Sequence, residues 1–245
     1  GCVMFHEVQG APLYCYTGDK TFDPAKPTVV LIHGVLGDHS VWIWQARYLA
    51  NHGFNVLAID LPGHGRSGGE APASVEQAAA TIAALLDAAG AQKAALVGHS
   101  WGSLIAMEAA ARLKGRVSHL ALIGTAAPMK VSPALIEASQ SDPETALKMI
   151  NVFSRSTLAS PTGAGLWVYG ASTALGRKVM RGNREVNVFH RGFMACDQYT
   201  GGPAAMAAIT CPVLFLLGRL DQMTPPGAAQ PLIDAARAAG RAVQV

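Results

Sequence analysis

The fold is decided by the stretch AALVGHSWGS, residues 94–103. An apolar run, typical of a strand, ends at Gly98, and a helical pattern follows from Ser103 to Leu113. The sharp turn between them tolerates no bulk at its two flanking glycines, so it pushes Ser100 out at the carboxyl end of the strand. We therefore predict that Ser100 is a nucleophile with an exposed hydroxyl.

A second match to the same glycine–serine pattern, GRSGG at residues 65–69, lacks this setting. The break LPGH, residues 61–64, separates it from the preceding strand, and Ala71-Pro72 follows where a helix should run. We therefore interpret Ser67 as a loop serine.

Composition excludes several classes of protein. Half of the 245 residues are hydrophobic, 14% are charged, and the net charge of +3 comes without a Lys/Arg block, so we expect no nucleic-acid partner. No apolar stretch approaches the roughly 20 residues that cross a bilayer, so we expect a soluble protein without stable membrane association. The four cysteines show no C-x-x-C spacing, which favours a reducing cytoplasm. Because the chain begins with Gly1 rather than Met, the question of whether a leader preceded it and was removed stays open. We expect the protein to be a monomer or a homodimer.

Strand and helix patterns alternate along most of the chain, which predicts an α/β fold with a mostly parallel central sheet between helices. The apolar runs expected to be strands are Val3–Val8, Leu13–Thr17, Thr28–His33, Asn55–Asp60, Ala94–Gly98, His119–Ile123, Pro212–Leu217 and Ala242–Val245. The expected helices between them are Val41–His52, Ser74–Ala89, Ser103–Leu113 and Ala228–Ala239.

The alternation stops between Pro128 and Pro212, where short amphipathic segments predict an inserted helical lid. One of its helices is expected to be capped by Asp142, with Pro143 in the first helical position. We therefore divide the chain into a core, residues 1–127 and 210–245, and a lid, residues 128–209; the core's last strand and final helix are expected to be truncated. The apolar residues of the lid either line a substrate pocket or form the lid's own core. The candidates for the pocket are Met149, Phe153 and Trp167 from the lid, with Gly34 and Leu36 from the core.

Acyl transfer from a serine also needs amide donors for the oxyanion. One predicted donor is the backbone N–H of Trp101, directly after the nucleophile. The other is the N–H of Val35 in HGVLG, residues 33–37, which follows a neighbouring strand. Alternatively, Gly34 and Gly37 only shape a turn there.

The acid that orients the base is predicted to be Asp221, just past the strand Pro212–Leu217. Its alternative role is an Asx turn or a helix cap. No histidine follows Asp221, and all eight histidines of the sequence lie upstream, with His190 kept as a reserve base. We expect the triad histidine on the order of ten residues past Val245. Without it, residues 1–245 alone are expected to be nearly inactive.

With these residues in hand, the chain resembles the α/β-hydrolase superfamily, in particular lidded members similar to carboxylesterases and pimeloyl-carrier-protein methyl esterase. The resemblance extends over nearly the whole chain. It rests on HGVLG (33–37) before Trp42 and Gln45, DLPGHGRS (60–67), the turn at Ser100, and Cys211-Pro212 leading through Gly218 to Asp221 and Thr224-Pro225. It implies Ser100 as nucleophile, Asp221 as acid, and oxyanion amides at Val35 and Trp101; a serine in the turn also argues against the branches that use aspartate there.

We therefore predict a cofactor-free and metal-free serine hydrolase for a small to medium carboxylic ester, with a hydrophobic portion favoured by Trp101 and the apolar lid. Two alternatives stay open. The same triad hydrolyses carbon–carbon bonds, lactones or amides, or performs perhydrolysis, in proteins of this fold. A hydrolase-derived binding protein is the second alternative, and it leads if the full-length product has no histidine after Asp221.

Overall fold

A computed structural model describes residues 4–158, 173–217 and 226–245, with side chains described outside 151–158 and Pro226. In these parts one sheet has the strand order β1-β2-β4-β3-β5-β6-β7-β8. The hairpin β1–β2 is antiparallel, β2 pairs antiparallel with β4, and the remaining pairs are parallel. The strands are β1 Met4–Val8, β2 Ala11–Tyr16, β3 Thr28–Ile32, β4 Asn55–Ile59, β5 Ala94–His99, β6 Val117–Ile123, β7 Val213–Leu216 and β8 Val243–Gln244.

The central strands are apolar because both of their faces are covered. Every residue of β3 and β4 is buried. Alternate side chains of β3 enter different cores: Val30 and Ile32 the larger one, Val29 and Leu31 the smaller one around Trp42. This two-sided burial fixes the register of the strands that carry the candidate site.

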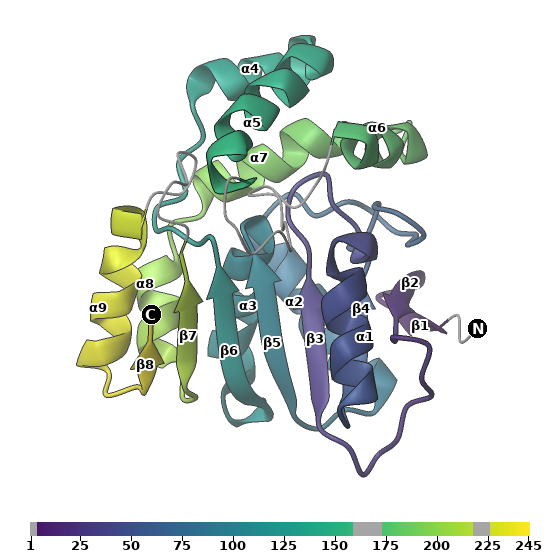
Figure 1. Cartoon of the computed structure of the whole chain (residues 1–245), viewed down its shortest axis with the longest axis vertical. Coiled ribbons are helices and arrows are strands. Elements are labelled where there is room, and N and C mark those ends of the chain that lie inside the picture. The colour runs from purple at the N-terminus through teal and green to yellow at the C-terminus, as the bar shows by residue number, and fades with distance from the viewer. Residues whose placement is uncertain (1–3, 159–172, 218–225) are drawn as a thin grey trace.

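Helices cover both faces of the sheet, with α1 in front of it and α2 and α3 behind it in the view of Figure 1. The layer behind the sheet continues through α8, which packs against α3 and α9. The helices are α1 Ile43–Asn51, α2 Val75–Ala89, α3 Trp101–Leu113, α4 Pro133–Ser141, α5 Pro143–Leu158, α6 Thr173–Gly182, α7 Val188–Gln198, α8 Gly202–Ala208 and α9 Gln230–Ala238, with short 3₁₀ turns at His39–Trp42, Lys114–Arg116 and Pro226–Ala229. None of the described helices is long and apolar enough to cross a bilayer.

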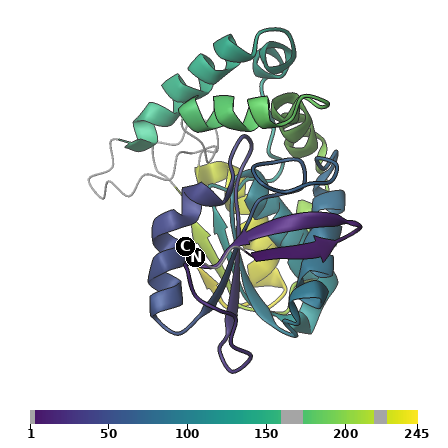
Figure 2. The ribbon, with the colours of Figure 1, turned by 90° about the vertical axis from the view of Figure 1, so that its right-hand side faces the viewer.

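Four helices, α4 to α7, lie above the upper end of the sheet and form a group that we call the cap helices (Figures 1 and 2). One predicted helix start is confirmed: α5 begins at Pro143, and the Asp142 carboxylate accepts from the Thr145 amide at 3.3 Å. The predicted lid range 128–209 also contains α8, which belongs by its contacts to the layer behind the sheet. The cap helices are therefore only part of that range.

Parallel strands place all of their carboxyl ends at one edge of the sheet. The chain runs from β3 to β4 on one side and then crosses to β5 on the other side of β3. Such a reversal leaves a crevice at the carboxyl ends of the two strands, where ligands of α/β proteins bind. In this chain the turn after β3 and Ser100 after β5 both lie at this edge of the sheet.

Candidate active site

Ser100 lies in a strained turn between β5 and α3. Its backbone has φ +55° and ψ −117°, a conformation that costs a non-glycine residue about 1–3 kcal/mol. A Cβ on Gly98 would collide with the carbonyl of Gly102, and one on Gly102 would collide with the Ile32 carbonyl and lie 2.6 Å from that of His33. Both glycines are therefore required by close backbone contact, as the sequence predicted.

The prediction that the Ser100 hydroxyl is exposed is wrong. The side chain is fully buried, and its Oγ has no hydrogen-bond partner among the described residues. The turn packs directly against the end of β3, since a Cβ on Gly102 would meet the carbonyl groups of Ile32 and His33, and this packing contributes to the burial. A buried hydroxyl without a hydrogen-bond partner lowers the stability of the folded protein, and Ser100 is such a residue.

A small network of hydrogen bonds fixes the backbone of the same turn. The Ser100 amide donates to the Ile123 carbonyl at 2.9 Å, which ties the turn to β6. Ser103 Oγ lies 2.5 Å from the Ser100 carbonyl oxygen and 2.9 Å from Thr125 Oγ1. The backbone on both sides of the Ser100 side chain is thus fixed.

The segment after β3 forms a tight turn beside Ser100. The Gly37 amide donates to the Gly34 carbonyl at 3.1 Å, and Leu36 has φ +61° in the third position of the turn. Because Gly102 contacts the backbone of Ile32 and His33, this turn and the start of α3 lie side by side.

The His33 side chain orients this turn. Its Nε2 accepts from the Leu61 amide at 3.0 Å, so Nδ1 carries the proton and donates to the Gly34 carbonyl at 2.8 Å. Burial lowers the pKa of His33, which keeps the ring neutral. In a planar trans peptide the C=O and N–H groups point in opposite directions, so holding the Gly34 oxygen also fixes the direction of the Val35 N–H.

Two backbone amides therefore qualify as oxyanion donors. Trp101 is the first residue of α3, where an N–H group has no acceptor within the helix and the helix dipole favours negative charge. Within the described parts of the chain, the Val35 N–H has no backbone acceptor either. The amides belong to adjacent segments, as the sequence predicted for strand ends that meet at one edge.

The other predicted site residues are only partly described. Leu36 is buried beneath the cap helices, and Met149 on α5 is half-buried against the larger core. Phe153 also belongs to α5, but its side chain lies outside the described part of the structure. Asp221 and Trp167 lie wholly outside the described residues, so their roles stay predictions.

Three buried histidines lie near the site without matching a general base. Both nitrogens of His33 are engaged, as described above. Burial lowers the pKa of His64 and of His99 to about 4, well below the neutral range that suits a general base. The reserve candidate His190 is held inside the cap, its Nδ1 3.3 Å from both Ser139 Oγ and the Ile136 carbonyl.

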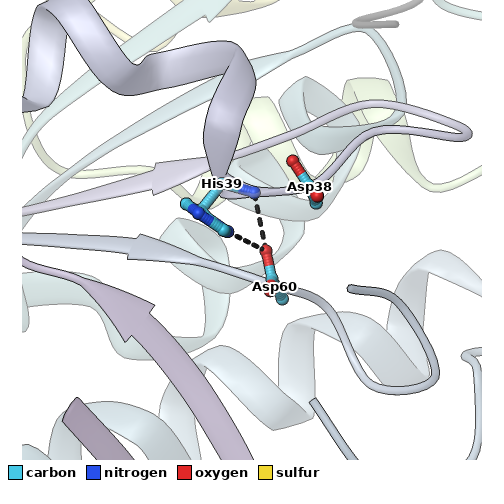
Figure 3. A group of neighbouring side chains, drawn as sticks. All are labelled: Asp38, His39 and Asp60. Atoms are coloured by element: carbon cyan, nitrogen blue, oxygen red, sulfur yellow. Dashed lines mark hydrogen bonds and ion pairs between the residues drawn. The ribbon is translucent and has the colours of Figure 1, made fainter. Parts of the chain in front are cut away.

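Asp38, His39 and Asp60 gather beside this region, as Figure 3 shows. The Asp60 carboxylate accepts from His39 through its amide at 2.6 Å and through Nδ1 at 2.8 Å, and from the Arg66 amide at 2.9 Å. Burial alone would raise the pKa of Asp60, but these bonds outweigh it and leave that pKa lowered. With its oxygens taken by protein donors, Asp60 ties the loop after β3 to the loop after β4.

Ser67 belongs to this second loop, which confirms its interpretation as a loop serine. Its hydroxyl donates to the Asp60 carbonyl at 2.6 Å and accepts from the Tyr14 amide at 2.9 Å. The bond to Asp60 closes the loop on itself, and the bond from Tyr14 holds it against β2 of the hairpin.

Sequence analysis missed two glycines of the cap helices. A Cβ on Gly192 of α7 would lie 3.1 Å from both Cγ atoms of Val35. A Cβ on Gly176 of α6 would lie 3.1 Å from Leu147 Cδ2 and 3.3 Å from Leu36 Cδ1. The available signal was a glycine inside a helical pattern, which usually has a packing or functional reason.

Comparison with known proteins agrees with this architecture. A family model described as the alpha/beta hydrolase fold matches residues 27–243. Lipase LipV of Mycobacterium tuberculosis is 37% identical over 108 residues, which cover 44% of this chain and 41% of the lipase. Epoxide hydrolase A of the same organism is 34% identical over 110 residues, which cover 43% of this chain and 34% of that enzyme. The matched segments thus span well under half of these relatives.

Solved structures share the fold over nearly the whole chain. The enol-lactonase of Burkholderia xenovorans LB400 superposes with a TM-score of 0.77 at 23% identity, covering 98% of this chain and 90% of that one. An esterase of Exiguobacterium antarcticum superposes with a TM-score of 0.78 at 20% identity, covering 100% and 90%.

Proposed function

Since the chain belongs to the α/β-hydrolase family, we propose that it is a serine hydrolase that cleaves a small to medium carboxylic ester. The observation that carries the proposal is Ser100: a strained residue at a strand–helix turn, whose buried hydroxyl has no partner among the described residues. Active sites hold such strain and such unsatisfied groups because reaction partners complete them.

In the proposed reaction, Ser100 Oγ attacks the ester carbonyl carbon while its proton passes to an imidazole base. The oxyanion then accepts from the Trp101 and Val35 amides. Collapse breaks the bond to the alcohol oxygen, which leaves with the proton from the base, and an acyl ester remains on Ser100. Water, deprotonated by the same base, hydrolyses this ester to a carboxylic acid and free serine.

The base in this proposal is a histidine that follows Asp221 in chain order, with the Asp221 carboxylate as its partner. The buried His33, His64 and His99 and the cap residue His190 do not suit the role, for the reasons given above. A serine that forms an acyl ester also favours carboxylic substrates over epoxides. The apolar side chains around the site, Trp101 and Leu36 among them, favour an ester with a hydrophobic portion.

The test is hydrolysis of p-nitrophenyl acetate, butyrate and octanoate by the full-length gene product. We expect Ser100→Ala to lower kcat by up to about 10⁶, as removal of a nucleophile does, and Ser141→Ala, at an exposed hydroxyl of α4, to change nothing. A fluorophosphonate should label Ser100 and not Ser67, as peptide mapping would show. Equal turnover by wild type and Ser100→Ala would contradict the proposal, and faster turnover of lactones or amides would change its substrate class.

A further inference from the structure

The cap helices contact the candidate oxyanion turn at two points without side chains of their own. Gly192 of α7 faces Val35, and Gly176 of α6 faces Leu36. Neither glycine has a positive φ, so backbone conformation does not require glycine at either position. Glycine is also unfavourable inside a helix, which leaves close approach as the physical reason for it here.

The Val35 side chain is confined on both sides. Its two methyl groups would lie 3.1 Å from a Cβ on Gly192, closer than ordinary van der Waals contact, and the residue is 1% exposed. Beneath it, the Gly34–Val35 peptide is held by His33 through the Gly34 oxygen. The turn has little room to move away if α7 moves toward it.

We propose that Gly192 is a positioning residue: it lets α7 rest on the Val35 methyl groups at the separation that aims the Val35 N–H at the reacting carbonyl oxygen. The inference rests on the proposed function. An oxyanion donor must lie 2.7–3.1 Å from the position of the oxyanion, so a shift of a few tenths of an ångström weakens it. The cap helices in this way set the rate as well as covering the site.

The test compares three glycine variants. Gly192→Ala places a methyl group against Val35 and should lower kcat about tenfold with KM within twofold, because the oxyanion exists only in the transition state. Gly176→Ala should lower kcat less, because it meets flexible Leu ends. Gly182→Ala, also in the cap helices and with nothing within 4 Å of its added Cβ, is the matched control and should change neither constant.

A double variant separates positioning from simple damage to the fold. Val35→Ala removes the methyl groups that meet the new side chain but keeps the backbone N–H. In that background Gly192→Ala should therefore cost less than twofold in kcat. The ¹H–¹⁵N resonance of the Val35 amide should shift in Gly192→Ala and stay in place in Gly182→Ala.

The outcomes are distinguishable. Wild-type kcat in Gly192→Ala, with Ser100→Ala inactive, overturns this inference and leaves the proposed function standing. A tenfold loss that persists in the Val35→Ala background overturns it as well. Failure of the proposed function shows separately, as full turnover by Ser100→Ala.

Discussion

The imidazole of His33 is a small group with a large structural effect. It links the Leu61 amide to the Gly34 carbonyl, and through the Gly34–Val35 peptide it fixes the direction of one proposed oxyanion donor. In the sequence, His33 stands directly before Gly34 in a glycine-rich stretch. Its tautomer is set by the Leu61 amide, in the distant segment after β4, and sequence spacing does not reveal that contact.

Replacement of His33 should therefore act on the transition state. We expect His33→Ala to lower kcat by about 10- to 100-fold with KM within about threefold, because one donor of the oxyanion is misdirected. His33→Gln, which retains a donor group, should recover part of the loss, and His119→Ala, at an exposed position of β6, serves as the control. Steady-state kinetics with urea unfolding of each variant measures this; a raised KM at wild-type kcat would contradict it.

At the scale of elements, the unit β5–Ser100–α3 was the most predictable part of the chain. The apolar run, the two glycines and the helical pattern together predicted the strand, the turn and the helix. The helix begins at Trp101 rather than at the predicted Ser103. Helical periodicity shows itself only from the first apolar repeat, whereas the strained Ser100 lets the helix begin at the next residue.

The same unit predicts a large stability effect at Gly98. Gly98→Ala should lower the free energy of unfolding by about 2–3 kcal/mol or prevent folding, because the new Cβ meets the fixed backbone of Gly102. Gly115→Ala, whose added Cβ has nothing within 4 Å, should change stability by less than about 1 kcal/mol. Urea denaturation followed by circular dichroism measures both. Equal unfolding midpoints for Gly98→Ala and Gly115→Ala would show that the turn at Ser100 has space for a side chain at Gly98, and would contradict this prediction.

At the scale of the whole molecule, the sheet and its helices follow from pattern, and the relation of the cap helices to them does not. Each expected strand begins and ends within two residues of the observed one, because burial on both faces leaves a continuous apolar signature in the central strands. The burial of Ser100 and the contacts of Gly176 and Gly192 arise from packing between segments far apart in sequence. Nothing in local periodicity encodes such contacts.

The buried histidines predict how the stability of the whole molecule depends on pH. His64 and His99 have pKa values of about 4 when folded, against 6.5 when unfolded, so the unfolded chain binds more protons between these values. The contribution of these two rings to the free energy of unfolding should therefore be constant above about pH 7 and fall as pH drops from 6.5 toward 4. Each imidazole contributes a slope of about 1.4 kcal/mol per pH unit.

Urea denaturation at pH 8, 6.5 and 5 tests this dependence. His99→Asn, which removes one of these imidazoles, should flatten the slope between pH 6.5 and 5 relative to wild type. A free energy of unfolding that does not change over this range would show that these rings are protonated, or accessible to water, in the folded protein.

The cap helices come from one continuous run of chain, between β6 and α8. Recombination that exchanged this single block would leave the strand pairings intact and place different helices above Ser100 and the turn after β3. The contact between Gly192 and Val35 restricts such exchanges, however. Replacement cap helices would also need a residue without a side chain above Val35. Without one, the new protein would combine an altered substrate preference with a lower kcat.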